Sequence, residues 1–221
     1  MKNFPNVTIL DHPLIRHKIA ILRDEKTGMK EFRELVEEIT TLMVYESFKE
    51  VPTKKVMVQT PLELTEQTMV ADNAVTVVPI LRAGLGMVNG VHTLFPTAKV
   101  GHIGLYRDEE TLEPHEYYCK LPDGIENSIA ILLDPMLATG GSAAAAVDFL
   151  KERGCKHIML MSIIGVPEGI ETVATAHPDV KIFVSTLDRQ LNEHRRAYGG
   201  FFFFVPACRP RPCCQRRRLV I

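Results

Sequence analysis

Blocks of apolar residues alternate with polar segments along most of the chain. Apolar runs with the length of buried strands cover Val75–Leu81, Lys99–Leu105, Ile129–Leu133, His157–Ile164 and Lys181–Thr186. Between and after these runs, the pattern predicts helices over Gly84–Phe95, Ser142–Arg153 and Pro167–His177. Strands that alternate with single helices favour right-handed crossovers. The pattern therefore predicts an α/β fold with a mainly parallel sheet flanked by helices.

The first 70 residues have a different pattern. Apolar residues at helical spacing predict a core-facing helix over Lys30–Phe48. Val56–Gln59 and Leu62–Leu64 predict an extended β-arm that bends at Pro61. Residues 11–27 mix apolar and basic residues, which leaves two interpretations open. They form either a short helix with a solvated face or a surface where basic side chains contact anions: Arg16, His17, Lys18 and Arg23.

Length and charge divide the chain into a body and a tail. With 221 residues, 46% of them hydrophobic, the chain can bury one substantial core. The net charge is −1, but seven arginines and no Lys, Asp or Glu follow residue 194. The first 194 residues therefore hold 19 basic and 27 acidic side chains. We predict a single domain over residues 1–194 and a poorly ordered, basic, Cys-rich tail over residues 195–221.

The same counts argue against several classes of function. An acidic body gives no support to nucleic-acid binding. No apolar run approaches the roughly 20 residues of a membrane span, and the first residues lack the apolar stretch of a signal peptide. Cys119 and Cys155 stand alone in the body, as is typical of reduced thiols. We therefore expect a cytoplasmic protein with no membrane partner.

The segment Ser128–Ala146 carries the strongest chemical signal. The strand Ile129–Leu133 ends at Asp134, and a loop with Thr139, Gly140, Gly141 and Ser142 then leads into an alanine-rich helix. Backbone N–H groups and the positive end of the helix dipole converge at such a loop and bind phosphate. An acid at the end of the strand suits sugar hydroxyls or a metal. The alternative is an ordinary turn with a Ser cap.

Two other loops follow predicted strands and should lie at the same sheet edge. The first contains Arg82, Gly84 and Gly86, which suits a diphosphate, although the glycines could serve only the turn. The second opens a polar segment, 106–126, at Arg107. This segment is either an active-site lid or a surface hairpin with an exposed arginine. The loops match neither a Walker nor a dinucleotide-binding glycine pattern. Together they suggest a ligand with a 5′-phosphate, a ribose and a second phosphate group.

Asp134–Ser142 resembles the phosphoribosyl-diphosphate signature of the type I phosphoribosyltransferases, and Pro135 is typical of the uracil phosphoribosyltransferases. Similar segments are Pro79–Gly86, Gly104–Arg107, Ala176–Val180 and Leu191–His194. The resemblance implies that uracil and phosphoribosyl diphosphate react to give UMP and diphosphate. It implies Asp134 and Arg107 as catalytic residues. The residues implied in phosphoribosyl-diphosphate binding are Arg82, Arg107, Asp134, Pro135, Met136, Leu137, Ala138, Thr139, Gly140, Gly141 and Ser142.

The resemblance also implies Mg²⁺ carried by the diphosphate rather than by a protein cage, a homo-oligomer, and activation by GTP. It ends at His194. The family continues with a segment that binds uracil, whereas this chain continues with Arg195-Arg196-Ala197-Tyr198, so no residue is assigned to uracil. Three hypotheses are open: an active uracil phosphoribosyltransferase, a homologue that binds phosphoribosyl diphosphate but is catalytically impaired, and a regulatory or interaction protein on the same fold.

Overall fold

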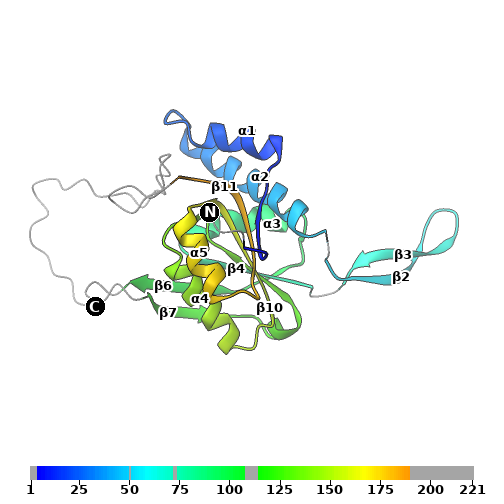
Figure 1. The fold of residues 1–221 in the computed structure, drawn as a ribbon. Helices are drawn as coiled ribbons and strands as arrows, with labels where there is room; N and C mark the ends of the chain where they lie inside the picture. Colours follow the sequence, from blue (N-terminus) through cyan, green and yellow to red (C-terminus); the bar gives the residue numbers. More distant parts are fainter. Residues whose placement is uncertain (1–3, 50, 72–73, 108–113, 190–221) are drawn as a thin grey trace, which may run out of the picture.

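The computed structural model describes residues 4–49, 51–71, 74–107 and 114–189. They form an α/β fold around one mainly parallel sheet (Figure 1). Its strands are, in spatial order, β1 (Val7–Ile9), β11 (Lys181–Leu187), β10 (His157–Gly165), β8 (Ile129–Leu133), β4 (Val75–Leu81), β6 (His102–Arg107) and β7 (Pro114–Lys120). Two short strands also join the sheet: β5 (Lys99–Val100) beside β4, and β9 (Met136–Leu137) beside β10. Among these pairings, only β6 with β7 is antiparallel.

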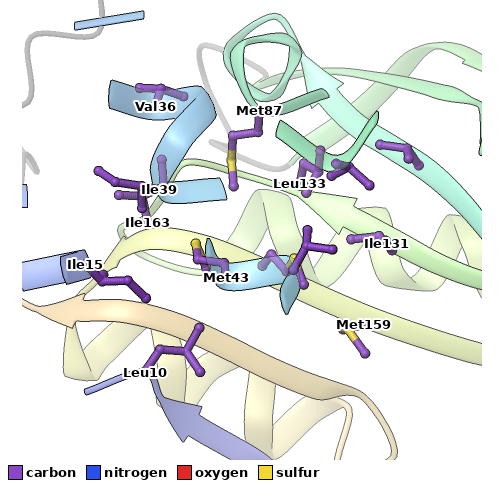
Figure 2. Packing of buried hydrophobic residues seen from close by; sticks show 14 of the residues in the cluster. Leu10, Ile15, Val36, Ile39, Met43, Met87, Ile131, Leu133, Met159 and Ile163 are labelled. Carbon is purple, nitrogen blue, oxygen red and sulfur yellow. The ribbon is translucent and has the colours of Figure 1, made fainter. Parts of the chain in front are cut away.

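Helices cover both faces of the sheet, which explains why its central strands are apolar throughout. Along β8, Ile131 and Leu133 face one core, whereas Ala130 and Leu132 face the other. The first core lies under α1 (Pro13–Leu22), α2 (Met29–Ser47) and α3 (Val88–His92), and Figure 2 shows its packing. The second core lies under α4 (Gly141–Glu152) and α5 (Pro167–Ala176). The predicted α/β fold class is confirmed.

The arm is longer than the sequence pattern predicts. It consists of β2 (Thr53–Gln59) and β3 (Leu64–Val70), which pair antiparallel with each other and form a separate two-stranded sheet. The turn lies at Pro61, as predicted, and is closed by the Thr60 amide, which donates to the Glu63 carbonyl at 2.9 Å. In Figure 1 the arm extends away from the central sheet.

Two predicted elements are divided. The predicted helix Gly84–Phe95 is a 3₁₀ helix, η1 (Ala83–Met87), followed by the short α3. The predicted strand Lys99–Leu105 is interrupted at Gly101 and becomes β5 and β6. The described part of 106–126 contains a hairpin strand, because Pro114–Lys120 form β7 beside β6, and Ile125–Asn127 form a second 3₁₀ turn; its role as a lid stays a prediction. The tail predicted over residues 195–221 lies outside the described residues.

Candidate active site

Three adjacent strands place the three candidate loops at one edge of the sheet. Strand β4 pairs with β8 up to Pro79↔Leu133 and with β6 through Leu81↔Gly104. All three strands run in the same direction, so their carboxyl ends meet. Arg82 follows β4, Arg107 is the last residue of β6, and Asp134 follows β8.

The loop after β8 is fixed along the end of β10. The Asp134 amide donates to the Met161 carbonyl at 3.2 Å, and the Pro135 carbonyl accepts from the Ile164 amide at 3.1 Å. Next, Met136 and Leu137 form β9, and the Leu137 carbonyl accepts from the Val166 amide at 3.1 Å. Pro135 is buried, whereas the Asp134 side chain is half-buried. The acid is therefore held by a rigid backbone and still reaches the surface.

The helix that follows begins at a glycine, not at a serine. Gly140 is the N-cap of α4, with φ of +80°, and its carbonyl accepts from the Ala144 amide at 2.8 Å. Ser142 lies inside the first turn, so the Ser cap of the alternative interpretation is wrong, and phosphate binding by this loop stays a prediction. The amides of Gly141, Ser142 and Ala143 precede the first helical hydrogen bond. They occupy the positive end of the helix dipole, where phosphates bind.

Glycines let this loop pack directly on α5. A Cβ on Gly140 would lie 2.5 Å from the Gly169 carbonyl oxygen and 2.9 Å from Cβ of Thr172. A Cβ on Gly169 would in turn overlap the Ala138 carbonyl and lie 2.8 Å from the Leu137 oxygen. Leu137, Ala138 and Gly140 thus pack closely on the start of α5. Gly169 is not among the residues predicted from the sequence, because nothing local in α5 marks it as a partner of this loop.

The Arg82 loop packs on the end of β8. A Cβ on Gly84 would overlap the Leu133 carbonyl oxygen and lie 3.0 Å from Cβ of Pro79. Arg82 is exposed, is the N-cap residue of η1, and follows a cis peptide bond from Leu81. A Cβ on Gly86 would make only an ordinary van der Waals contact, 3.7 Å from Cγ1 of Val36. Of the two glycines, Gly84 therefore brings the candidate diphosphate loop against the residue before Asp134.

Arg107 ends β6 in a different setting. The last residues of β6 extend beyond the pairing with β4 and are paired with β7 alone, Arg107 with Pro114. The rings of Tyr106 and His115 stack across these two strands, with centroids 5.6 Å apart. Residues 108–113 lie outside the described part of the chain, so the lid interpretation of that stretch stays a prediction.

The basic residues near the N-terminus mostly have acidic partners. Lys18 donates to Glu38 at 2.6 Å, and Arg16 pairs with Asp11 on the surface. Arg23 pairs with Asp188, whose side chain is only 2% exposed. This arrangement favours the helix with a solvated face over an anion-binding surface. The Arg23–Asp188 pair joins residues 165 positions apart, so no local pattern in the sequence predicts it.

The two described cysteines do not suit nucleophilic chemistry. Both are free thiols. Burial raises the pKa of Cys155 to about 11 and also raises the pKa of Cys119. A raised pKa leaves little of the reactive thiolate near neutral pH. Within the described residues, no group of three or more His, Cys, Asp and Glu side chains could hold a metal ion.

Comparison with known proteins decides the family. A family model described as uracil phosphoribosyltransferase matches residues 9–201. A uracil phosphoribosyltransferase of Thermoanaerobacter sp. (strain X514) is 56% identical over 191 residues, covering 86% of this chain and 91% of that protein. The chain belongs to the uracil phosphoribosyltransferase family. The resemblance described from the motifs is thereby confirmed.

Two solved structures share the fold of this chain. A protein from Aquifex aeolicus is 36% identical, with a TM-score of 0.78 over 85% of this chain and 89% of that chain. An adenine phosphoribosyl transferase from Trypanosoma brucei, solved with AMP, pyrophosphate and ribose-5-phosphate, is 15% identical. Its TM-score is 0.57 over 100% of this chain and 95% of its own. This second likeness shows the fold alone.

Proposed function

We propose that this chain transfers the phosphoribosyl group of phosphoribosyl diphosphate to uracil, giving UMP and diphosphate in pyrimidine salvage. It is a glycosyltransferase that transfers a pentosyl group. The observation that carries the proposal is the packing of the Arg82 loop on the end of β8 through Gly84. This packing places a candidate diphosphate loop beside a candidate phosphosugar loop, as a substrate with phosphate at both ends of one ribose requires.

Each part of the edge has a proposed role. Pro135–Leu137 anchor the loop along β10, and Ala138–Ser142 hold the 5′-phosphate with the first-turn amides of α4. Asp134 accepts hydrogen bonds from the ribose hydroxyls. Arg82 and Arg107 bind the diphosphate, for which a guanidinium is a planar and permanently charged donor.

The reaction needs charge stabilisation more than a nucleophile from the protein. Displacement at the anomeric carbon passes through a cationic, oxocarbenium-like state. Arg82 and Arg107 stabilise the departing diphosphate, while the fixed backbone around Asp134 orients the ribose. Mg²⁺ prefers hard oxygen ligands, so the diphosphate oxygens and the half-buried Asp134 carboxylate would suit it, and when bound it would neutralise the leaving group.

A coupled assay of the full chain tests this function. Uracil, phosphoribosyl diphosphate and Mg²⁺ together should release diphosphate, and omission of uracil should abolish the release. The matched variant Asp134→Asn keeps the side-chain size and should lower kcat/KM by about 100-fold, because the ribose hydroxyls lose a charged acceptor. Release no faster than in a control without enzyme would reject the proposal.

We also propose that the protein is a homo-oligomer, joined through the β2–β3 arm. Large apolar side chains are exposed along the arm, and Leu62 at its tip is 95% exposed. A lone two-stranded sheet is marginally stable, and exposed apolar clusters mark contact sites. Light scattering after size exclusion should give a multimer for the wild type and a smaller species for Leu64→Glu. Equal masses would contradict the arm as the interface.

Two further parts of the proposal follow the family resemblance. GTP is proposed as an activator, and its addition should raise the rate at subsaturating phosphoribosyl diphosphate. A single domain over residues 1–194 and a cytoplasmic location are also proposed, and the free thiols of Cys119 and Cys155 suit a reducing compartment. None of the described helices is long and apolar enough to cross a membrane.

A further inference from the structure

The β6–β7 hairpin contains a bulge where β6 leaves the parallel sheet. Gly104 pairs with Leu81 of β4 on one side and with Tyr118 of β7 on the other. The next residue of β6, Leu105, pairs with Glu116, so Tyr117 has no partner in the ladder. Bulges bend the strands that contain them and often re-aim side chains beside active sites. Here the bulged strand is β7, and the bulge lies opposite Gly104 and Leu105, just before the end of β6 at Arg107.

The ring of Tyr117 lies directly over Gly104. A Cβ on Gly104 would lie 2.5 Å from Cζ of Tyr117 and 2.7 Å from its Cε2, so only a glycine leaves room for the ring in this position. Tyr117 nevertheless remains 56% exposed. An exposed ring fitted onto a glycine adds little to the hydrophobic core. Its contact can, however, hold the bulge in one geometry.

Beyond the bulge, the end of β6 lies outside the parallel ladder, although Leu105 still packs against the second core. Leu105, Tyr106 and Arg107 are paired with β7 only. On β7, Glu116 accepts from Arg153 at 2.9 Å, which ties the first pair after the bulge to the end of α4. The bulge and this ion pair, together with Leu105 and Cys119 packed against the second core, therefore set the angle of this hairpin relative to β4.

We propose that Tyr117, fitted against Gly104, is a positioning residue for Arg107 in the binding of phosphoribosyl diphosphate. Gly104 lies beside Leu81, the residue before Arg82, so the contact also lies at the base of the diphosphate loop. A change in the bulge would move Arg107 relative to Arg82, and two groups that share one diphosphate tolerate little displacement. The inference rests on the proposed function and on the role proposed there for Arg107.

Calorimetry with phosphoribosyl diphosphate and Mg²⁺ tests the inference on the full chain. Tyr117→Ala should weaken binding about tenfold, because the hairpin loses its fixed angle. Tyr117→Phe keeps the ring and should bind as the wild type does. The control Tyr118→Ala removes the neighbouring exposed ring and should also bind normally. Gly104→Ala should weaken binding because the added methyl displaces the ring, and Gly104→Ala with Tyr117→Ala should be no weaker than Tyr117→Ala alone.

A second cycle separates positioning from general damage. In an Arg107→Ala background, Tyr117→Ala should cause no further loss of affinity, because the residue it positions is gone. The KM for phosphoribosyl diphosphate should rise in Tyr117→Ala, while the KM for uracil and the melting temperature stay unchanged. The inference would be overturned if the losses of affinity from Tyr117→Ala and Arg107→Ala were additive. It would also be overturned if Tyr118→Ala bound phosphoribosyl diphosphate as weakly as Tyr117→Ala. A wild type that binds no phosphoribosyl diphosphate would overturn the proposed function as well.

Discussion

The loop after β8 and the β6–β7 hairpin lie at the same edge of the sheet, but they are held in different ways. The loop is fixed by backbone against backbone, through Gly140, Gly169 and its hydrogen bonds to β10. The end of the hairpin is held by side chains, namely the Tyr117 ring, the Glu116–Arg153 pair, and Leu105 and Cys119 packed against the second core. A backbone contact cannot relax around an added methyl group, whereas a side chain can move. The loop should therefore be far more sensitive to small substitutions than the hairpin.

The largest effect should come from Gly140→Ala. Its φ of +80° is costly for alanine, and the new Cβ would lie 2.5 Å from the Gly169 oxygen. Together these should lower the free energy of unfolding by about 4 kcal/mol and abolish binding of phosphoribosyl diphosphate. Gly124→Ala is the matched control, since φ is +84° there with open space around it, and it should cost only about 1 kcal/mol. If urea unfolding gave equal losses for Gly140→Ala and Gly124→Ala, the positive φ alone, and not the close contact with Gly169, would explain the cost.

The second largest loss of stability should come from a residue that supports the loop after β8 from outside it. The Asp188 amide donates to the Gly165 carbonyl at 2.9 Å, and Gly165 pairs with Leu137 of the loop. Arg23→Ala would leave the buried Asp188 carboxylate without its partner and should cost about 3 kcal/mol in urea unfolding. The exposed Arg16–Asp11 pair is the control, and Arg16→Ala should cost less than about 1 kcal/mol. If Arg23→Ala and Arg16→Ala lowered the free energy of unfolding by similar amounts, burial of the Arg23–Asp188 pair would have no influence on its contribution to stability.

On the hairpin side, a smaller loss of stability is expected. Glu116→Gln removes the charge of a half-buried carboxylate that faces the exposed Arg153 and should cost about 1 kcal/mol. The control Glu66→Gln breaks the exposed Lys55 pair on the arm and should change stability by at most a few tenths of a kcal/mol. A Glu116→Gln cost as large as that of Gly140→Ala would remove the distinction between the two regions.

The smallest loss of stability should come from Asp179→Asn, which lies outside both the loop after β8 and the β6–β7 hairpin and should leave their structures unchanged. Lys151 donates to Asp179 at 2.7 Å, and this hydrogen bond holds the pKa of Asp179 below its ordinary value. The stabilisation is complete above the ordinary Asp pKa of about 4 and is lost as the pH falls through the lower folded-state value. Asp179→Asn should therefore be slightly less stable at pH 7 and equal to the wild type in strong acid. A difference that persists in strong acid would point to a cause other than this charge.

The apolar runs predicted the central strands well, because parallel strands buried on both faces read as continuous apolar segments. Strands β1 and β9 were missed, since they have three and two residues and exist only through pairing with distant strands. Strand β7 was missed because its mixture of Tyr, His and Glu follows a bulged, half-exposed ladder. Local sequence carries little information on such elements.

The candidate site was predictable in part. The rule that ligands lie at the carboxyl ends of parallel strands placed Arg82, Arg107 and Asp134 at one edge. The order β8-β4-β6, with the earliest of the three strands in the middle, could not be predicted, because pairing order depends on tertiary packing. The contacts of Gly84 and Gly169 likewise involve residues distant in sequence.

The pairing of β1 with β11 also constrains how the chain folds. The Ile182 amide donates to the Asn6 carbonyl at 2.8 Å, and the Asn6 side chain donates to the Val180 carbonyl at 2.9 Å across 174 positions. During synthesis, the first strand must wait until almost the whole described chain has emerged before it can pair. Contacts of this separation form late and slow folding. Until then β10 is the open edge of the sheet, so a chain that stalls or is truncated before β11 would expose a strand that other chains can pair with.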